Sequence, residues 1–232
     1  MSEEDLPIIE RAFPYTMTGA ERLQALVDAV RYCERGPVAG AFVECGVWRG
    51  GSVLAMLLTL QDEGSEARDV YLYDTFEGMT EPTEEDTSPL EQPALETWRS
   101  AEESGEQAWG WLLGEFDEGT VRETVLSSGY PESRVHFVRG PVEDTIPGTV
   151  PDRIALLRLD TDWYESTRHE LEHLYPRLVP GGVLIIDDYG HWEGARRAAD
   201  EYFGETGEHL FLNRIDYAAR IAVRRGEPGA RS

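Results

Sequence analysis

The sequence of 232 residues contains no lysine: all 21 of its basic residues are arginines. This excludes Schiff-base chemistry, a phosphate-binding P-loop lysine and a lysine general base. Two cysteines, Cys33 and Cys45, are too few for a disulfide scaffold, and we expect the reducing environment of the cytoplasm. No apolar stretch approaches the roughly 20 residues of a membrane-spanning helix. The first ten residues are acidic where a signal peptide would be basic.

Positive charge is scarce. The 21 basic residues stand against 45 acidic ones, which gives a net charge of −24 and an isoelectric point near 4.5. Such a surface repels phosphate backbones and anionic lipids, so we expect neither nucleic acid nor membrane as a partner. Hydrophobic residues make up 41% and aromatic residues 10% of the chain, as is typical of a globular protein. The length is that of one domain, which we expect to cover residues 1–232.

Apolar periodicity alternates between strand and helix along the chain. Residues 19–35 have apolar side chains at helical spacing, within an N-terminal helical segment of about 1–36 that ends at Gly36-Pro37. Short apolar runs predict buried strands, each followed by a helical stretch. The strands are predicted at 41–45, 70–74, 135–138, 154–160 and 183–188, and the main helices at 51–61, about 164–178 and about 193–204.

The order of these elements predicts an α/β fold. Repeated β-α-β units form a parallel sheet, and two runs near 208–215 and 218–225, joined by a short turn, predict an antiparallel hairpin at its edge. Pro180-Gly181-Gly182 is expected to be a turn into the fifth strand. The fold class is therefore a doubly wound, Rossmann-like sheet of five parallel strands with a C-terminal antiparallel hairpin.

An acidic insertion, about residues 77–128, interrupts this rhythm. Its first part, 77–118, contains 13 acidic residues and one arginine, which accounts for half of the net charge of the chain. One interpretation is a solvated insertion. The other is a mobile lid or substrate wall, because the segment also contains three tryptophans, Trp98, Trp109 and Trp111.

The first candidate site lies where the first strand meets its helix, in the sequence ECGVWRGGS from Glu44 to Ser52. Glycines there allow the backbone to approach a ligand, and helix amides point at it. The glycine spacing is not the dinucleotide fingerprint, and an acid precedes Gly46. The pattern suits a ligand that ends in an ammonium and a carboxylate, although a packing turn would also explain it.

Two further segments would border the same cleft. Asp74 ends the second predicted strand, where a carboxylate can accept hydrogen bonds from the hydroxyls of a ribose. The alternative is an ordinary helix N-cap. The turn Gly140-Pro-Val-Glu143-Asp144 follows the third strand and would hold an adenine ring or be an ordinary βα turn.

Three carboxylates form the strongest pattern. Asp160 ends the fourth predicted strand, and Asp187 and Asp188 end the fifth. Neighbouring parallel strands bring these ends together, where like charges repel and a divalent cation relieves the repulsion. Oxygen ligands favour Mg²⁺, Mn²⁺ or Ca²⁺ over zinc. Capping of the following helices is the alternative.

Together these segments resemble a known family, the metal- and S-adenosylmethionine-dependent sugar O-methyltransferases typified by macrocin O-methyltransferase. The resemblance extends from about residue 13 to 204 and is weakest over 79–128. It rests on Tyr15-Thr16-Met17, FVECGVWRGGS, YDTFEG, GPVEDTIP, LRLDTDWYEST and PGGVLIIDDYGHWEGARRAADEYF. The metal arrangement is also similar to that of catechol O-methyltransferase.

The resemblance implies a role for each matching position. Glu44, Gly46 and Ser52 would surround the methionine part of S-adenosylmethionine, Asp74 would bind the ribose, and Glu143 and Asp144 would lie near the adenine. Tyr15, Thr16 and Met17 would close over this cofactor, and Asp160, Asp187 and Asp188 would hold Mg²⁺, with Mn²⁺ as an alternative.

The implied reaction is transfer of a methyl group to a hydroxyl of a small molecule, most simply a sugar hydroxyl of a glycosylated antibiotic. Asp160 is the first candidate for the base and His191 the second, and Asp162 would orient either. A phenolic acceptor, an NAD(P)-dependent oxidoreductase and a non-catalytic cofactor-binding protein remain alternatives. The apolar face of helix 19–35 and the aromatic side chains of the insertion predict a homo-oligomer.

Overall fold

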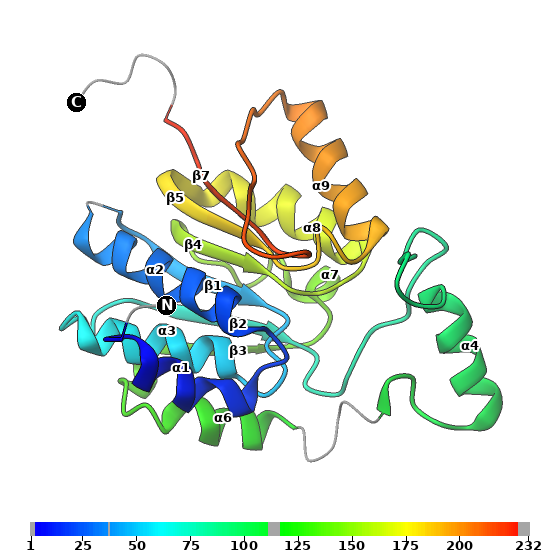
Figure 1. Ribbon diagram of the computed structural model, residues 1–232, viewed down its shortest axis with the longest axis horizontal. Coiled ribbons are helices and arrows are strands. Elements are labelled where there is room, and N and C mark those ends of the chain that lie inside the picture. Colours follow the sequence, from blue (N-terminus) through cyan, green and yellow to red (C-terminus); the bar gives the residue numbers. More distant parts are fainter. Residues whose placement is uncertain (1–2, 37, 111–116, 227–232) are drawn as a thin grey trace.

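A computed structural model describes residues 3–36, 38–110 and 117–226. Within these ranges, seven strands form one sheet with the order β3-β2-β1-β4-β5-β7-β6 (Figure 1). β1 to β5 are parallel, and β7 pairs antiparallel with β5 and with β6. The strands are β1 (Ala41–Cys45), β2 (Val70–Asp74), β3 (Val135–Arg139), β4 (Ile154–Leu159), β5 (Leu178–Ile186), β6 (Asn213–Arg214) and β7 (Arg220–Val223).

Both faces of the sheet are buried, which explains why its central strands are continuous apolar runs. Every residue of β1 is buried. Alternate side chains enter different cores: Phe42 packs among the residues of one cluster and Val43 among those of the other. Leu156 and Leu157 of β4 divide in the same way.

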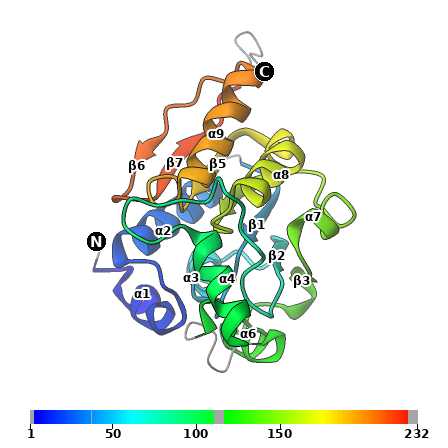
Figure 2. The same cartoon turned by 90° about the vertical axis from the view of Figure 1, so that its right-hand side faces the viewer.

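Helices cover the two faces of this sheet (Figure 2). The first layer contains α1 (Leu6–Ala12), α2 (Ala20–Arg35), α3 (Gly51–Asp62) and α6 (Glu118–Leu126), and the second contains α7 (Val142–Thr145), α8 (Tyr164–Leu174) and α9 (Glu193–Thr206). Among the helices of the described ranges, none combines the length and the apolar character that a bilayer crossing requires. The predicted fold class, a doubly wound sheet with a C-terminal hairpin, is confirmed.

Three local predictions differ from the structure. Pro180-Gly181-Gly182 lies inside β5, because pairing with β4 begins at Leu178 and resumes at Val183 after a shift in register. The helix predicted to reach residue 178 ends at Leu174, and a 3-10 turn (Tyr175–Arg177) that contains Pro176 follows it. Both hairpin strands are shorter than predicted.

The acidic insertion is not uniform. Its last part forms α6, which packs on α3 through the buried side chains of Val121 and Val125 and begins at a capping box on Asp117. This part belongs to the helical layer of the sheet. Before it, α4 (Ala94–Ser104) stands off the edge toward which the parallel strands run (Figure 1). Trp111 lies outside the described residues.

Candidate active site

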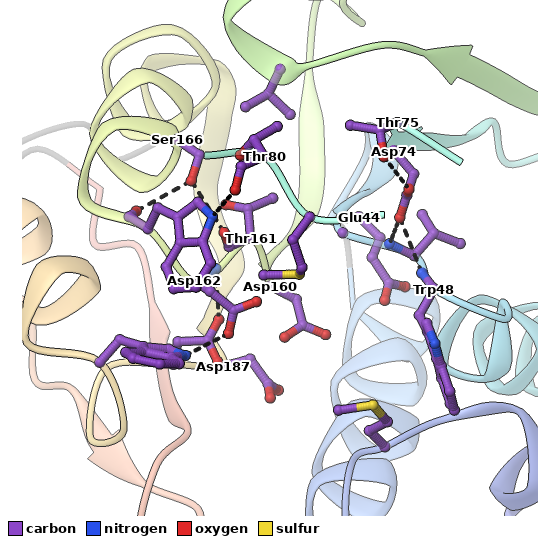
Figure 3. Close-up of a pocket in the computed structure, with 18 of the residues that line it drawn as sticks. Glu44, Trp48, Asp74, Thr75, Thr80, Asp160, Thr161, Asp162, Ser166 and Asp187 are labelled. Atoms are coloured by element: carbon purple, nitrogen blue, oxygen red, sulfur yellow. Dashed lines mark hydrogen bonds between the residues drawn. The ribbon is translucent and has the colours of Figure 1, made fainter. Parts of the chain in front are cut away.

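A cavity of about 380 Å³ opens at the carboxyl ends of the parallel strands, and Figure 3 shows its two sides. Glu44, Trp48 and Asp74 lie on one side, and Asp160, Asp162 and Asp187 lie on the other. Its lining also includes residues from the N-terminal segment, the insertion and the β6–β7 turn, namely Thr16, Met17, Thr18, Arg22, Met79, Thr80, Glu91, Trp109 and Tyr217.

Glu44 is almost fully buried at 1% exposure and still borders the cavity. Its Oε1 accepts a hydrogen bond from Arg158 at 2.5 Å. Its Oε2 has no hydrogen-bond partner among the described residues. Burial raises the pKa of Glu44 to about 8, although the Arg158 charge opposes this shift. A buried acceptor without a partner is costly, so this oxygen is suited to a donor on a ligand.

Both carboxylate oxygens of Asp74 already accept hydrogen bonds from backbone amides of the protein. Its Oδ2 accepts the amide N–H groups of Val47 and Trp48 at 2.7 and 3.1 Å, and its Oδ1 accepts that of Phe76 at 2.7 Å. A carboxylate offers about four acceptor positions, so little capacity remains for ribose hydroxyls. Asp74 therefore shapes the β1–α3 loop and borders the cavity at the same time.

Two glycines allow the close approaches that build this side. Gly46 has a φ of +79°, and a Cβ on it would lie 1.9 Å from the carbonyl oxygen of Asp160. A Cβ on Gly51 would lie 2.6 Å from the carbonyl oxygen of Tyr15. Both glycines thus bring segments that are distant in sequence against the β1–α3 loop.

The structure brings together most of the residues predicted to bind the cofactor. Thr16, Met17, Glu44, Gly46, Ser52, Asp74 and Glu143 all line the cavity. Tyr15 and Asp144 are outside its lining: the Tyr15 backbone packs against Gly51, and Asp144 is exposed in α7.

The three predicted metal ligands lie close together. One carboxylate oxygen from each of Asp160, Asp187 and Asp188 lies within 4.8 Å of the others. The pairing of Leu159 with Ile186 explains this, because it aligns the ends of β4 and β5. The spacing is one that a single divalent cation can span with small side-chain rotations.

Arg158 was not predicted, and it changes the charge balance of this cluster. It is 2% exposed, and its guanidinium contacts Glu44 at 2.5 Å and both Asp160 and Asp187 at 2.7 Å. Arg22 pairs with Asp187 as well. The available signal was one arginine in an otherwise apolar strand, since a buried arginine requires a partner.

Two arginines do not neutralise all of the acids. Within the described ranges, neither Asp162 nor Asp188 forms a salt bridge with an arginine. Burial and the charge of Asp162 raise the pKa of Asp188 well above its ordinary range. Burial raises the pKa of Asp160 to about 6 against the lowering effect of Arg158, and burial with the Asp160 charge raises that of Asp162 to about 8. Carboxylates thus outnumber arginines in this cluster, and the raised pKa values reflect burial and mutual repulsion, which a bound cation would relieve.

The remaining catalytic candidates, Asp162 and His191, have polar contacts with neighbouring aromatic and acidic side chains. Asp162 has a φ of +67°, and its Oδ1 accepts the indole N–H of Trp192 at 2.8 Å. The two ring nitrogens of His191 lie 3.1 Å from Glu91 and 3.2 Å from the hydroxyl of Tyr217. Both side chains border the cavity.

An aromatic wall of Trp109, Trp163 and Trp192 lines the cavity beside Asp162. The ring centroids of Trp109 and Trp163 are 5.5 Å apart, and those of Trp163 and Trp192 are 5.0 Å apart. The sequence suggested a substrate wall from three tryptophans of the insertion. Of the two that lie in the described ranges, Trp109 lines the cavity and Trp98 does not. Broad apolar rings of this kind offer a packing surface for a flat or cyclic ligand.

A family profile and several known proteins match most of the chain. The profile of the family described as macrocin-O-methyltransferase (TylF) matches residues 2–224. The chain belongs to the macrocin O-methyltransferase family. As a member of that family it is an O-methyltransferase, and the predicted resemblance is confirmed.

Curated members of the family support this assignment. A tetracenomycin rhamnosyl 4′-O-methyltransferase of Streptomyces olivaceus is 36% identical over 92% of this chain and 78% of its own length. The mycinamicin III 3″-O-methyltransferase of Micromonospora griseorubida is 33% identical over 89% of this chain and 75% of its own. The solved structure of the O-methyltransferase NovP superposes with a TM-score of 0.77 at 29% identity, covering 91% of this chain and 83% of NovP.

Proposed function

We propose that this chain transfers a methyl group from S-adenosylmethionine to a hydroxyl of a glycosylated natural product, with the acceptor bound beside a Mg²⁺ ion. One observation carries the proposal: a single cavity joins the unpartnered Glu44 oxygen to the cluster of Asp160, Asp187 and Asp188. The first feature suits the ammonium group of the methyl donor, and the second suits a divalent cation.

The donor would occupy the side of the cavity formed by β1 and β2. Glu44 Oε2 would accept from its ammonium group, with Gly46 and Ser52 beside the methionine part. Asp74 would contribute its remaining acceptor capacity to the ribose, and Glu143 would lie toward the adenine. Thr16 and Met17 would cover the donor from the N-terminal segment.

The cation would be held by Asp160, Asp187 and Asp188. Their oxygens all lie within 4.8 Å, all three donors are carboxylates, and Asp188 is buried, which together fit Mg²⁺ or Mn²⁺. These residues would hold the cation, which would supply Lewis-acid activation of the acceptor hydroxyl.

The side chains of this protein would orient the acceptor and remove its proton. Asp160 is the first candidate base because it lies in the metal cluster and lines the cavity. His191 is the second, with its ring oriented by Glu91 and Tyr217. Asp162, fixed by Trp192, would orient the hydroxyl.

The relatives favour a sugar hydroxyl as the acceptor. Two of them are described by the sugar position that they methylate: 4′ of a rhamnosyl tetracenomycin, and 3″ of mycinamicin III. The aromatic wall would pack against such a ring. A phenolic hydroxyl is the alternative. An NAD(P)-dependent oxidoreductase is disfavoured because the sequence lacks the dinucleotide fingerprint and would have no use for three clustered carboxylates.

Assembly and location stay predictions. The apolar face of α2 is buried within the chain itself and therefore does not support the predicted oligomer. Phe13, Tyr15 and Met17 are exposed apolar side chains of the N-terminal segment, which a second copy of the chain would cover. We keep the homo-oligomer and the cytoplasmic location as expectations.

The proposal is tested by calorimetry and by a transfer assay. We expect S-adenosylmethionine to bind and NAD⁺ not to bind. With methyl-labelled donor and Mg²⁺, we expect mass spectrometry to detect one added methyl group on a member of an acceptor panel. The panel contains three compounds that appear in the names of the relatives: the rhamnosyl tetracenomycin, mycinamicin III and demethyldecarbamoylnovobiocin. A simple catechol tests the phenolic alternative. Binding of NAD⁺ in place of the methyl donor would contradict the proposal.

A further inference from the structure

One carboxylate of the acidic insertion differs from its neighbours. Glu84 and Glu85 are exposed, whereas Asp86 is completely buried at 0% exposure. A segment that only solvates the surface does not bury a charged side chain, because the loss of hydration must be compensated by hydrogen bonds. Asp86 therefore has a structural task that its acidic neighbours do not share.

The partners of Asp86 lie on two separate segments. Its Oδ1 accepts the backbone N–H of Tyr164, the first residue of α8, at 2.7 Å. Its Oδ2 accepts both the backbone N–H and the hydroxyl of Thr83, at 2.7 and 3.0 Å. The backbone carbonyl of the next residue, Thr87, accepts a hydrogen bond from the backbone N–H of Glu193, the first residue of α9, at 2.8 Å. The insertion thus binds the starts of both helices.

Neither helix has a side-chain cap from its own N-cap residue. The residue before α8 is Trp163 and the residue before α9 is Trp192, and an indole has no oxygen that can accept from the first helical amides. Asp86 and Thr87 supply those acceptors from a part of the chain about 80 residues earlier for α8. Gly194 of α9 leaves the space that the Asp86 carboxylate occupies, since a Cβ on it would lie 2.1 Å from Asp86 Oδ1.

The residues just before these helix starts are catalytic candidates. Asp162 precedes Trp163, and His191 precedes Trp192. The two starts are also joined directly, because Trp192 donates its indole N–H to Asp162. A shift of either helix start would move both candidates relative to the metal cluster.

We propose that Asp86 is a positioning residue that ties the starts of α8 and α9 together and thereby sets the placement of Asp162 and His191 at the active site. Its effect on catalysis rests on the proposed function, whereas its effect on geometry does not. The acidic insertion is accordingly part of the framework of the active site, anchored at Asp86 as well as through Trp109.

The geometric part is tested by NMR of the tryptophan indole N–H groups in protein labelled with ¹⁵N-tryptophan. We expect Asp86→Ala to shift the resonances of Trp163 and Trp192, whose indoles donate to Thr80 and Asp162. The resonance of Trp48, on the donor side of the cavity, should remain in place. Glu84→Gln is the matched control, because it removes one exposed charge from the same segment. Identical spectra for the two variants would overturn the proposal.

The catalytic part is tested by the split between kcat and binding. In Asp86→Ala we expect kcat to fall by about 10²-fold, the effect of a misplacement near 1 Å, with the dissociation constant of S-adenosylmethionine unchanged. Glu84→Gln should retain wild-type kcat. A merely structural defect would lower the folded fraction and not the turnover per bound donor, and that result would overturn the catalytic role. Failure of the wild-type enzyme to methylate would instead refute the proposed function.

A second variant keeps the test decisive if Asp86→Ala does not fold. Gly194→Ala retains every charge and favours the helix, yet its methyl group would displace Asp86 Oδ1. We expect the same two indole resonances to shift and kcat to fall. Gly204→Ala is the matched control, because it lies in the same helix with open space where its Cβ would stand. Equal behaviour of the two glycine variants would contradict the anchoring role of Asp86.

Discussion

Replacing Arg158 with methionine is expected to lower the free energy of unfolding by about 3–5 kcal/mol, the usual result of removing one partner from buried ion pairs. Arg158 is 2% exposed and contacts Glu44, Asp160 and Asp187. Methionine occupies a similar volume without a charge. The lost stability therefore comes from carboxylates that no longer face the Arg158 guanidinium, and not from an unfilled cavity.

The measurement is denaturant unfolding of the wild type and the variant. Arg153→Met is the matched control, because Arg153 is exposed just before the same strand, and its loss should change the unfolding free energy by less than about 0.5 kcal/mol. Adding Glu44→Gln to Arg158→Met should recover part of the loss, since it removes one stranded charge. A cost for Arg158→Met equal to that of the control would mean that the buried acids do not need this arginine.

Asp188→Asn is expected to weaken divalent-cation binding by about 10²-fold or more and to reduce turnover at least as strongly. Of the three proposed ligands, Asp188 is the best one to change, because Asp187 also pairs with Arg158 and Arg22, and Asp160 also pairs with Arg158. Asparagine keeps the shape of the side chain and removes its charge. The defect should therefore appear in the metal affinity, with the fold intact.

Electron paramagnetic resonance of Mn²⁺ measures this affinity without any acceptor. Asp152→Asn, which removes an exposed charge near the start of β4, should bind Mn²⁺ like the wild type. Equal Mn²⁺ binding by Asp188→Asn and Asp152→Asn would contradict the assignment of the cluster. The three acids would then serve as partners of the two arginines and the following helices.

The fold was predictable because the signals that specify it are local. Each central strand is a short apolar run, and the alternation with helices leaves few topologies. The clustering of Asp160 with Asp187 and Asp188 followed from the same logic, since the ends of neighbouring parallel strands meet at one edge. The proximity of these three carboxylates was thus predictable from the sequence.

Residues whose roles depend on distant partners were not predictable in this way. Arg158 was missed because nothing in the sequence tells which acids a buried arginine meets. Asp86 looked like one more charge in an acidic segment, and only its contact with Tyr164 separates it from Glu84. Asp74 was placed correctly at the end of β2, but its hydrogen bonds to the β1–α3 loop depend on a loop conformation that spacing does not reveal.

Two arginines change the charge balance that the sequence predicts for the three clustered acids. From the sequence, three clustered acids required an outside cation, yet Arg158 and Arg22 already neutralise part of this charge. A divalent ion would relieve the burial and mutual repulsion that raise the pKa values of Asp160, Asp162 and Asp188.

Methyl transfer before and after removal of divalent cations tests the central claim most directly. The wild-type enzyme is incubated with methyl-labelled S-adenosylmethionine and the panel acceptor that it methylates, first with Mg²⁺, then in excess EDTA, and then after Mg²⁺ or Mn²⁺ is added back. We predict that transfer stops in EDTA and returns with either ion, because in the proposed mechanism Asp160, Asp187 and Asp188 would hold the cation beside the acceptor. Undiminished methyl transfer in excess EDTA would contradict the account.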